Sequence, residues 1–198
     1  MSVIVAVTDR HLSKIPFFDQ FEKIAKAGPD MIILREKGLS SPDYRSIAET
    51  CIDISVRYGI EFCINSFTDI AAELKIKNIQ LPLELFKRDI GKTNGFDSVG
   101  VSIHSKEDAV SVERLGADYL IYGNVFESQC KPSVPAKGLD SIADICSSVD
   151  IPVYGIGGID EKNAISVIKA GAEGVCMISA LMTADDPSTI VSAVKKCF

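Results

Sequence analysis

Val99-Gly-Val-Ser-Ile-His-Ser105 is a short apolar run that ends in a polar turn, and it predicts a β-strand followed by a loop. It places His104, one of only two histidines in the chain, at the carboxyl end of that strand. Histidine is the side chain best suited to exchange a proton near neutral pH. His104 is therefore either a proton carrier or a side chain that only hydrogen-bonds the next turn.

Similar apolar runs recur along the chain, with helix-like segments between them. Most are apolar over their whole length, which is typical of parallel strands covered on both faces. The predicted strands are Val3–Val7, Met31–Leu34, Glu61–Ile64, Asn78–Leu81, Val99–Ile103, Tyr119–Tyr122, Val153–Ile156 and Gly174–Ile178. Strands alternating with helices fit an open doubly wound sheet or a closed (β/α)8 TIM barrel, and a count of eight favours the barrel.

The segments between the strands carry helix start and stop signals. Glycines follow most of them, and Ser41, Ser105 and Asp160 are candidate N-caps. The predicted helices are Phe18–Ala27, Pro42–Tyr58, Thr68–Leu74, Leu85–Ile90, Lys106–Leu115 and Glu161–Ala170. The long irregular segment 127–137 follows the sixth strand, and a loop of that length in a small domain is usually functional or mobile.

Composition sets further bounds. With 198 residues, 46% of them hydrophobic, the chain has enough apolar material for a single compact barrel domain over residues 1–198. Its formal charge of −6 and pI of about 5.0 disfavour nucleic acid and anionic membrane surfaces as partners. No apolar run approaches the roughly 18 residues of a membrane span. We expect no membrane association.

The six cysteines are scattered, with neither a Cys-x-x-Cys pair nor a histidine cluster beside them. This pattern indicates no zinc site and no disulfide framework, and it suits a reducing, cytoplasmic location. Cys130 and Lys131 lie in the long loop, where Cys130 would be able to approach His104. An inert thiol is the simpler interpretation, because no third residue is visible to hold a Cys–His pair.

In a barrel, the residues just after each strand converge on one face, where sites in this fold are built. Arg35 and Lys37 follow the second strand, and their spacing lets both face the pocket with Glu36 turned away. They form either a solvated charge cluster or an anion site. In an acidic protein, cations at a polar mouth favour a carboxylate or phosphate ligand.

A second anion signal follows the last two strands. Gly157 and Gly158 leave backbone N–H groups open to a phosphate, and Ser179 and Ala180 follow the eighth strand. Barrels commonly bind phosphate after their seventh and eighth strands. Alone, the two glycines are more often a tight turn, but with Ser179 they predict a monophosphate cup.

Several motifs also occur in a specific order and spacing. They are Val7-Thr-Asp-Arg10, Leu34-Arg-Glu-Lys37, Gly100-Val-Ser-Ile-His-Ser105, Gly116-Ala-Asp-Tyr119, Tyr154-Gly-Ile-Gly-Gly-Ile159 and Gly171-Ala-Glu-Gly-Val-Cys-Met-Ile-Ser-Ala180. Together they resemble the thiamine phosphate synthase superfamily over nearly the whole chain. The resemblance implies a (β/α)8 barrel and two functional branches, the synthase and the TenI family of thiazole tautomerases.

The synthase branch joins a pyrimidine pyrophosphate to a thiazole phosphate and requires magnesium held by two aspartates. At the matching positions this chain has Ser66, after Asn65, and Leu85. Neither side chain replaces a carboxylate on a hard cation. The resemblance therefore argues against synthase activity and predicts no metal and no cofactor.

Three stretches of the chain resemble the TenI branch: Gln80-Leu-Pro82, Ser102-Ile-His-Ser105 and Gly123-Asn-Val-Phe-Glu-Ser-Gln-Cys-Lys131. It implies an isomerase, a thiazole tautomerase of thiamine biosynthesis, that aromatises a thiazole carboxylate phosphate with His104 as acid and base. The implied substrate-binding residues are Arg35, Lys37, Asn65, Ser102, Lys131, Gly157, Gly158, Ser179 and Ala180. The alternatives are a diverged thiamine phosphate synthase and a non-catalytic TenI-type ligand-binding regulator. A homodimer stays open.

Overall fold

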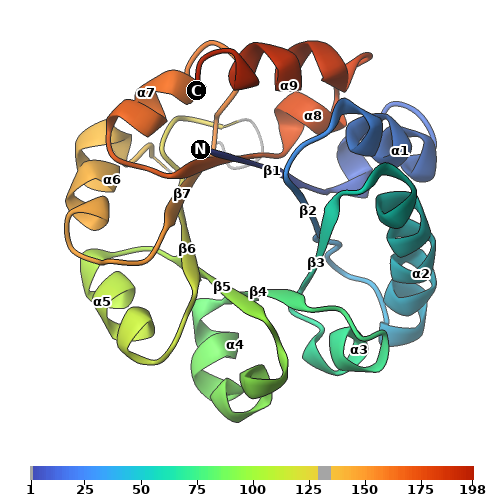
Figure 1. Cartoon of the computed structure of the whole chain (residues 1–198), viewed down its shortest axis with the longest axis horizontal. Helices are drawn as coiled ribbons and strands as arrows, with labels where there is room; N and C mark the ends of the chain where they lie inside the picture. The colour runs from blue at the N-terminus through green and yellow to red at the C-terminus, as the bar shows by residue number, and fades with distance from the viewer. Residues whose placement is uncertain (1, 129–134) are drawn as a thin grey trace.

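The apolar runs form strands that pair in chain order, and the last strand pairs with the first, so the sheet closes into a barrel (Figure 1). This computed structural model describes residues 2–128 and 135–198. The strands are β1 Val3–Val7, β2 Met31–Leu34, β3 Glu61–Asn65, β4 Asn78–Pro82, β5 Ser98–Ile103, β6 Tyr119–Gly123, β7 Val153–Ile156 and β8 Gly174–Met177. All pairings are parallel. The predicted (β/α)8 barrel is confirmed.

Helices surround the strands in a ring (Figure 1). The α-helices are α1 Phe17–Ala27, α2 Ser41–Tyr58, α3 Thr68–Glu73, α4 Leu83–Arg88, α5 Lys106–Arg114, α6 Gly138–Cys146, α7 Ala164–Lys169, α8 Ser179–Met182 and α9 Pro187–Lys195. Two short 3₁₀ helices, η1 Arg10–Leu12 and η2 Ile90–Gly95, complete the list. Within the described ranges, no helix combines the length and apolarity needed to cross a bilayer.

Two predicted helix starts are wrong for local reasons. Ser40, not Ser41, caps α2, because its hydroxyl accepts the N–H of Asp43. The helix predicted from Glu161 starts only at Ala164. There the Asp160 carboxylate accepts the N–H of Lys162 and holds a turn ahead of the helix.

The helix predicted over Leu85–Ile90 is also misplaced. The structure has α4 over Leu83–Arg88 and a separate 3₁₀ helix from Ile90. Pro82 ends β4 and precedes α4, so its fixed φ sets the helix start earlier than the apolar spacing indicated.

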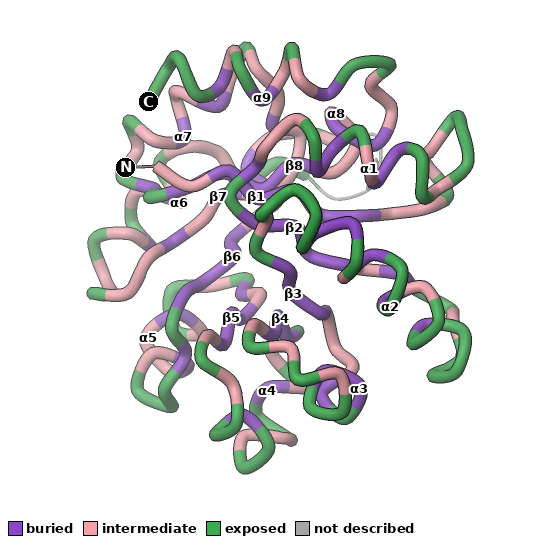
Figure 2. The backbone as a smooth tube through the Cα atoms, turned by 45° about the vertical axis from the view of Figure 1, so that its right-hand side comes forward, coloured by how far each residue is buried: buried purple, intermediate pink, exposed green. Residues whose placement is uncertain are grey.

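The strands are buried on both faces, and the exposed backbone lies mainly on the surrounding helices and loops (Figure 2). Val5, Ile33 and Cys176 belong to a cluster inside the barrel, whereas Ile4 and Ile32 belong to the larger cluster that includes the helices. Neighbouring residues along a strand thus serve two separate cores. Because both faces of the strands are buried, most strand positions are apolar.

Burial also makes most described thiols unreactive. It raises the pKa of the Cys63 and Cys176 thiols inside the barrel, and that of Cys146 to about 11. These groups are thiols, not thiolates, at neutral pH. Cys130 lies outside the described residues.

The packing of α1 gives a stability prediction. Phe21 is fully buried and meets the Phe62 ring edge-on at 6.4 Å between centroids, whereas Phe18 on the same helix is 38% exposed. Phe21→Ala should lower the free energy of unfolding by about 3–5 kcal/mol, because it leaves a cavity. Phe18→Ala is the matched control and should change it by about 0.5 kcal/mol or less. Urea titrations followed by circular dichroism measure both; equal losses would contradict this packing.

Candidate active site at the barrel mouth

A cavity of about 490 Å³ opens at the carboxyl ends of the strands. Arg35, Lys37, Asn65, Ser102, His104 and Gly157 line it, so the structure brings together these residues of the predicted site from β2, β3, β5 and β7. They lie at or just beyond the carboxyl ends of these four parallel strands, and the closed sheet directs all of these ends to one face. The predicted polar pocket is therefore present.

The rest of the predicted phosphate cup lies just beyond the cavity wall. Gly157 and Ile178 line the cavity, and Gly158 and Ser179 are the next residues along the chain. Ser179 and Ala180 begin α8. Lys131, also predicted to bind substrate, lies outside the described residues.

The two glycines of the cup have positive φ values of 101° and 65°. A Cβ on Gly157 would lie 2.5 Å from that of Asn124, and one on Gly158 would lie 2.3 Å from the Glu127 carbonyl. Glycine is thus required where the β7 loop packs against the loop after β6. Within the described ranges, the N–H groups of Gly158, Ser179 and Ala180 donate to no recorded acceptor.

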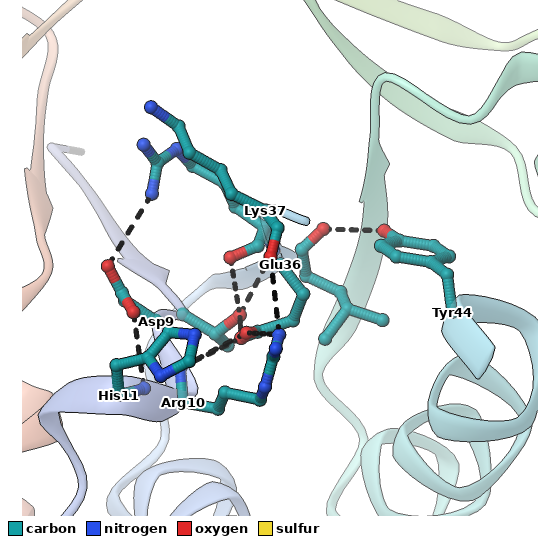
Figure 3. A network of polar contacts seen from close by, with 9 residues as sticks. Asp9, Arg10, His11, Glu36, Lys37 and Tyr44 are labelled. Carbon is teal, nitrogen blue, oxygen red and sulfur yellow. Dashed lines mark hydrogen bonds and ion pairs between the residues drawn. The ribbon is translucent and has the colours of Figure 1, made fainter. Parts of the chain in front are cut away.

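Glu36 anchors the β2 end of the site. Its carboxylate is buried and accepts the Thr8 hydroxyl at 2.7 Å, the Arg10 backbone N–H at 3.1 Å and the Arg10 guanidinium at 3.2 Å (Figure 3). It is therefore turned toward the β1 end, as the spacing of its neighbours indicated. These bonds fix the loop between β2 and α2 against β1.

The two cations beside Glu36 differ in their surroundings. Arg35 is only partly exposed, and its guanidinium lies 3.9 Å from the carboxylate of Asp9. Lys37 is exposed and extends away from the Glu36 network in Figure 3. Both line the cavity, so they supply positive charge at its entrance.

Tyr44 joins the ends of β2 and β3 from α2. Its hydroxyl donates to the Leu34 carbonyl at 2.6 Å and accepts the Asn65 N–H at 3.3 Å. Its ring stacks on Phe67, another cavity residue, with 4.0 Å between centroids. Burial raises the pKa of Tyr44 far above its ordinary value, so the phenol stays protonated and holds Asn65 at the mouth.

The positions that the family resemblance assigns to magnesium do not fit that ion. The Ser66 hydroxyl accepts a hydrogen bond from the Asn65 amide, and Leu85 packs against the hydrophobic core. No group of three potential metal-ligating side chains occurs in residues 2–128 and 135–198. Magnesium prefers carboxylate and water oxygens, and neither position supplies a carboxylate.

His104 is exposed at the cavity rim, one residue beyond β5. Its recorded contacts are through the backbone. The His104 N–H donates to the Asp108 carboxylate at 3.3 Å, and its carbonyl accepts from Lys137. The structure thus places His104 at the rim of the predicted site.

The predicted site did not include Gln80 and Asn124, two buried polar residues that line the cavity. Gln80 lies on β4, and Asn124 follows β6 beside Gly157. Gln80 lies two residues before Pro82 at the end of β4, and alternate residues of a strand face the same side. This spacing was the signal that pointed to Gln80.

Comparison with known proteins gives a consistent set of relatives. A sequence model described as thiamine monophosphate synthase (TMP-TENI) matches residues 4–181. Thiamine-phosphate synthase of Clostridium acetobutylicum is 34% identical, covering 96% of this chain and 93% of the relative. That of Pyrococcus furiosus is 30% identical, covering 98% and 93%.

The similarity extends to solved structures. Thiamine phosphate pyrophosphorylase from Pyrococcus furiosus superimposes with a TM-score of 0.84 at 28% identity, covering 98% of this chain and 94% of that one. A 3-hexulose-6-phosphate synthase superimposes with a TM-score of 0.75 at 16% identity, a likeness of fold alone.

These relatives correct the predicted activity. The sequence pattern predicted a cofactor-independent isomerase and argued against synthase activity. This prediction is wrong, because relatives over nearly the full chain carry the name thiamine-phosphate synthase. The prediction relied on the two missing carboxylates. It gave them more weight than the similarity of nearly the whole chain to synthases.

The Glu36 network gives a prediction on stability. Glu36→Gln should lower the free energy of unfolding by about 1–3 kcal/mol, because an amide cannot neutralise Arg10 or accept all three donors in a buried place. Glu22→Gln is the matched control; Glu22 bonds Arg57 and Tyr58 at the surface, where such pairs contribute little. Urea titration compares the two. A loss no larger in Glu36→Gln than in the control would show that the network is dispensable.

Proposed function

Because the chain belongs to the thiamine monophosphate synthase family, we propose that it forms thiamine phosphate by joining a pyrimidine pyrophosphate to a thiazole phosphate. The observation that carries this proposal is the coincidence of synthase relatives over nearly the full chain with a cavity that has cations after β2 and N–H groups without an acceptor close to it after β7 and β8. Two anionic substrates need two such regions.

Arg35 and Lys37 are the groups that hold the pyrophosphate. They flank Glu36 just after β2, and the bonds of Glu36 keep their loop in place. A guanidinium offers paired N–H donors to phosphate oxygens, and an ammonium adds a point charge. The resemblance also implies Lys131 as a substrate-binding residue.

The phosphate of the thiazole belongs at the ends of β7 and β8, which β1 separates from the end of β2. Gly158, Ser179 and Ala180 offer amide N–H groups that the described chain leaves without acceptors. Such groups bind phosphate oxygens directly, and the glycines let the ligand approach the backbone. Asn65 and Ser102 line the cavity from β3 and β5.

In the reaction, the bond from the pyrimidine's methylene carbon to pyrophosphate breaks, and that carbon bonds to the thiazole ring nitrogen. The residues at the magnesium positions do not fit the ion, so positive charge for the departing pyrophosphate comes from Arg35 and Lys37. No ring proton has to be removed in this coupling. An acid–base role for His104 stays a prediction, as do the homodimer and the cytoplasmic location.

The direct test supplies the purified chain with both substrates and measures thiamine phosphate by chromatography, with magnesium and with a chelator. Formation of thiamine phosphate in either condition supports the proposal. Binding of thiazole phosphate without any product in both conditions would overturn it in favour of the non-catalytic ligand-binding alternative.

Arg35 provides the sharpest residue-level prediction. Arg35→Ala should lower kcat/KM for the pyrimidine pyrophosphate about 10- to 100-fold, because it removes charge-assisted hydrogen bonds to the leaving group. Arg57→Ala is the matched control; it removes a largely exposed guanidinium from the far end of α2. Steady-state kinetics with the thiazole phosphate saturating gives both values. Equal rates for the two variants would remove Arg35 from the site.

A further inference from the structure

Asn163 holds the loop after β7 from its far end. It precedes α7, but its side chain makes no capping bond to that helix. The amide nitrogen instead donates to the Gly158 carbonyl at 2.8 Å, and the amide oxygen accepts the Asp160 N–H at 3.0 Å. A carbonyl can only accept and a backbone N–H can only donate, so these two bonds settle which way the amide faces.

Asn163 is itself held in place by its own turn. The Asp160 carboxylate accepts the Asn163 N–H at 3.3 Å, and the Ser166 hydroxyl donates to the Asn163 carbonyl at 2.6 Å. Ala164 and Val167, on the helix that follows, are buried in the core. The amide is therefore an oriented donor on a packed support.

Three successive carbonyls at the end of β7 all accept hydrogen bonds from the protein. Those of Ile156 and Gly157 accept N–H groups from the loop after β6, and that of Gly158 accepts the Asn163 amide. In a planar trans peptide, the C=O and the following N–H point in opposite directions. The N–H groups of Gly158 and Ile159 are thus turned away from these partners, and within residues 2–128 and 135–198 neither donates to a recorded acceptor.

The two glycines make the bond from Asn163 necessary. Glycine adopts positive and negative φ about equally readily, so steric restraints alone do not decide whether such a loop presents its N–H groups or its carbonyls. The loop after β6 fixes the Gly157 carbonyl, whereas the recorded partner of the Gly158 carbonyl is the Asn163 amide. A carbonyl oxygen turned toward a phosphate would repel it, because both carry negative charge.

We propose that Asn163 is a positioning residue of the phosphate cup. It holds the Gly158 carbonyl on the side of α7, so that this peptide presents its N–H and not its carbonyl to the phosphate of the thiazole substrate. Successive backbone N–H groups form anion-binding sites of this kind, and Gly157 beside them lines the cavity. This inference rests on the proposed function, and in it Asn163 acts through Gly158 without touching the ligand.

The experiment measures the affinities for thiazole phosphate and for the pyrimidine pyrophosphate by calorimetry, each ligand alone. Asn163→Ala should weaken the binding of thiazole phosphate about 10-fold, because the cup loses one oriented peptide. The pyrimidine pyrophosphate should bind as in the wild type, because Arg35 and Lys37 hold it. In steady-state kinetics, KM for thiazole phosphate should rise while kcat stays unchanged.

Ser166→Ala is the matched control for this variant. It removes a hydrogen bond of the same turn without touching Gly158, and it should leave both affinities as in the wild type. A second measurement needs no variant to fold. In NMR spectra of the wild type, thiazole phosphate should move the Ile159 backbone amide proton downfield and leave the Asn163 side-chain amide signals in place.

The outcomes separate this inference from the proposed function. Equal losses for both ligands in Asn163→Ala, an unchanged affinity for thiazole phosphate, or an Ile159 amide signal that does not move would each overturn the positioning role. If the wild type forms no thiamine phosphate while Asn163→Ala still weakens thiazole phosphate alone, the proposed coupling fails and the role of Asn163 stands.

Discussion

The parallel pairing of β1 with β8 is the constraint on which the rest of the structure depends. Val3, Ile4, Val5 and Ala6 lie in register with Gly174, Val175, Cys176 and Met177, and this pairing closes the sheet. Closure gives every strand two neighbours and leaves no unpaired edge. It also brings Arg35 after β2 and Gly157 after β7 to one mouth, although more than a hundred residues separate them in the chain.

Within that frame, small residues decide how closely the loops approach the cavity. Gly157 and Gly158 let the β7 loop meet the loop after β6, where the N–H groups of Val125 and Phe126 donate to the carbonyls of Ile156 and Gly157. Side chains at these positions would separate the two loops and widen the mouth. The same glycines therefore serve packing and leave the Gly158 N–H open to a ligand.

The sequence pattern predicted the features that recur in every strand–helix unit, and it missed the contacts that only one pair of strands makes. Strand runs, their order and the polar strand ends follow from burial on both faces, a rule that applies to every unit. The partners of Glu36 did not follow, because Thr8 and Arg10 meet it only after β1 pairs with β2. Gln80 was missed for the same reason, since Gly100 and Ser102 become its neighbours only through the β4–β5 register.

The N-cap at Ser40 and the start of α7 at Ala164 depend on individual side-chain hydrogen bonds, which the spacing of apolar residues does not predict.

The predicted enzyme class was wrong because two missing carboxylates were given more weight than the barrel that holds Arg35, Lys37, Asn65 and Ser102 around one cavity. A barrel mouth binds its ligand through many groups on separate strands, so the loss of one kind of ligand leaves the others in place. In this chain the buried Glu36 carboxylate fixes the loop that carries Arg35 and Lys37 through its bonds to Thr8 and Arg10, so both cations stay at the cavity although the two carboxylates are missing.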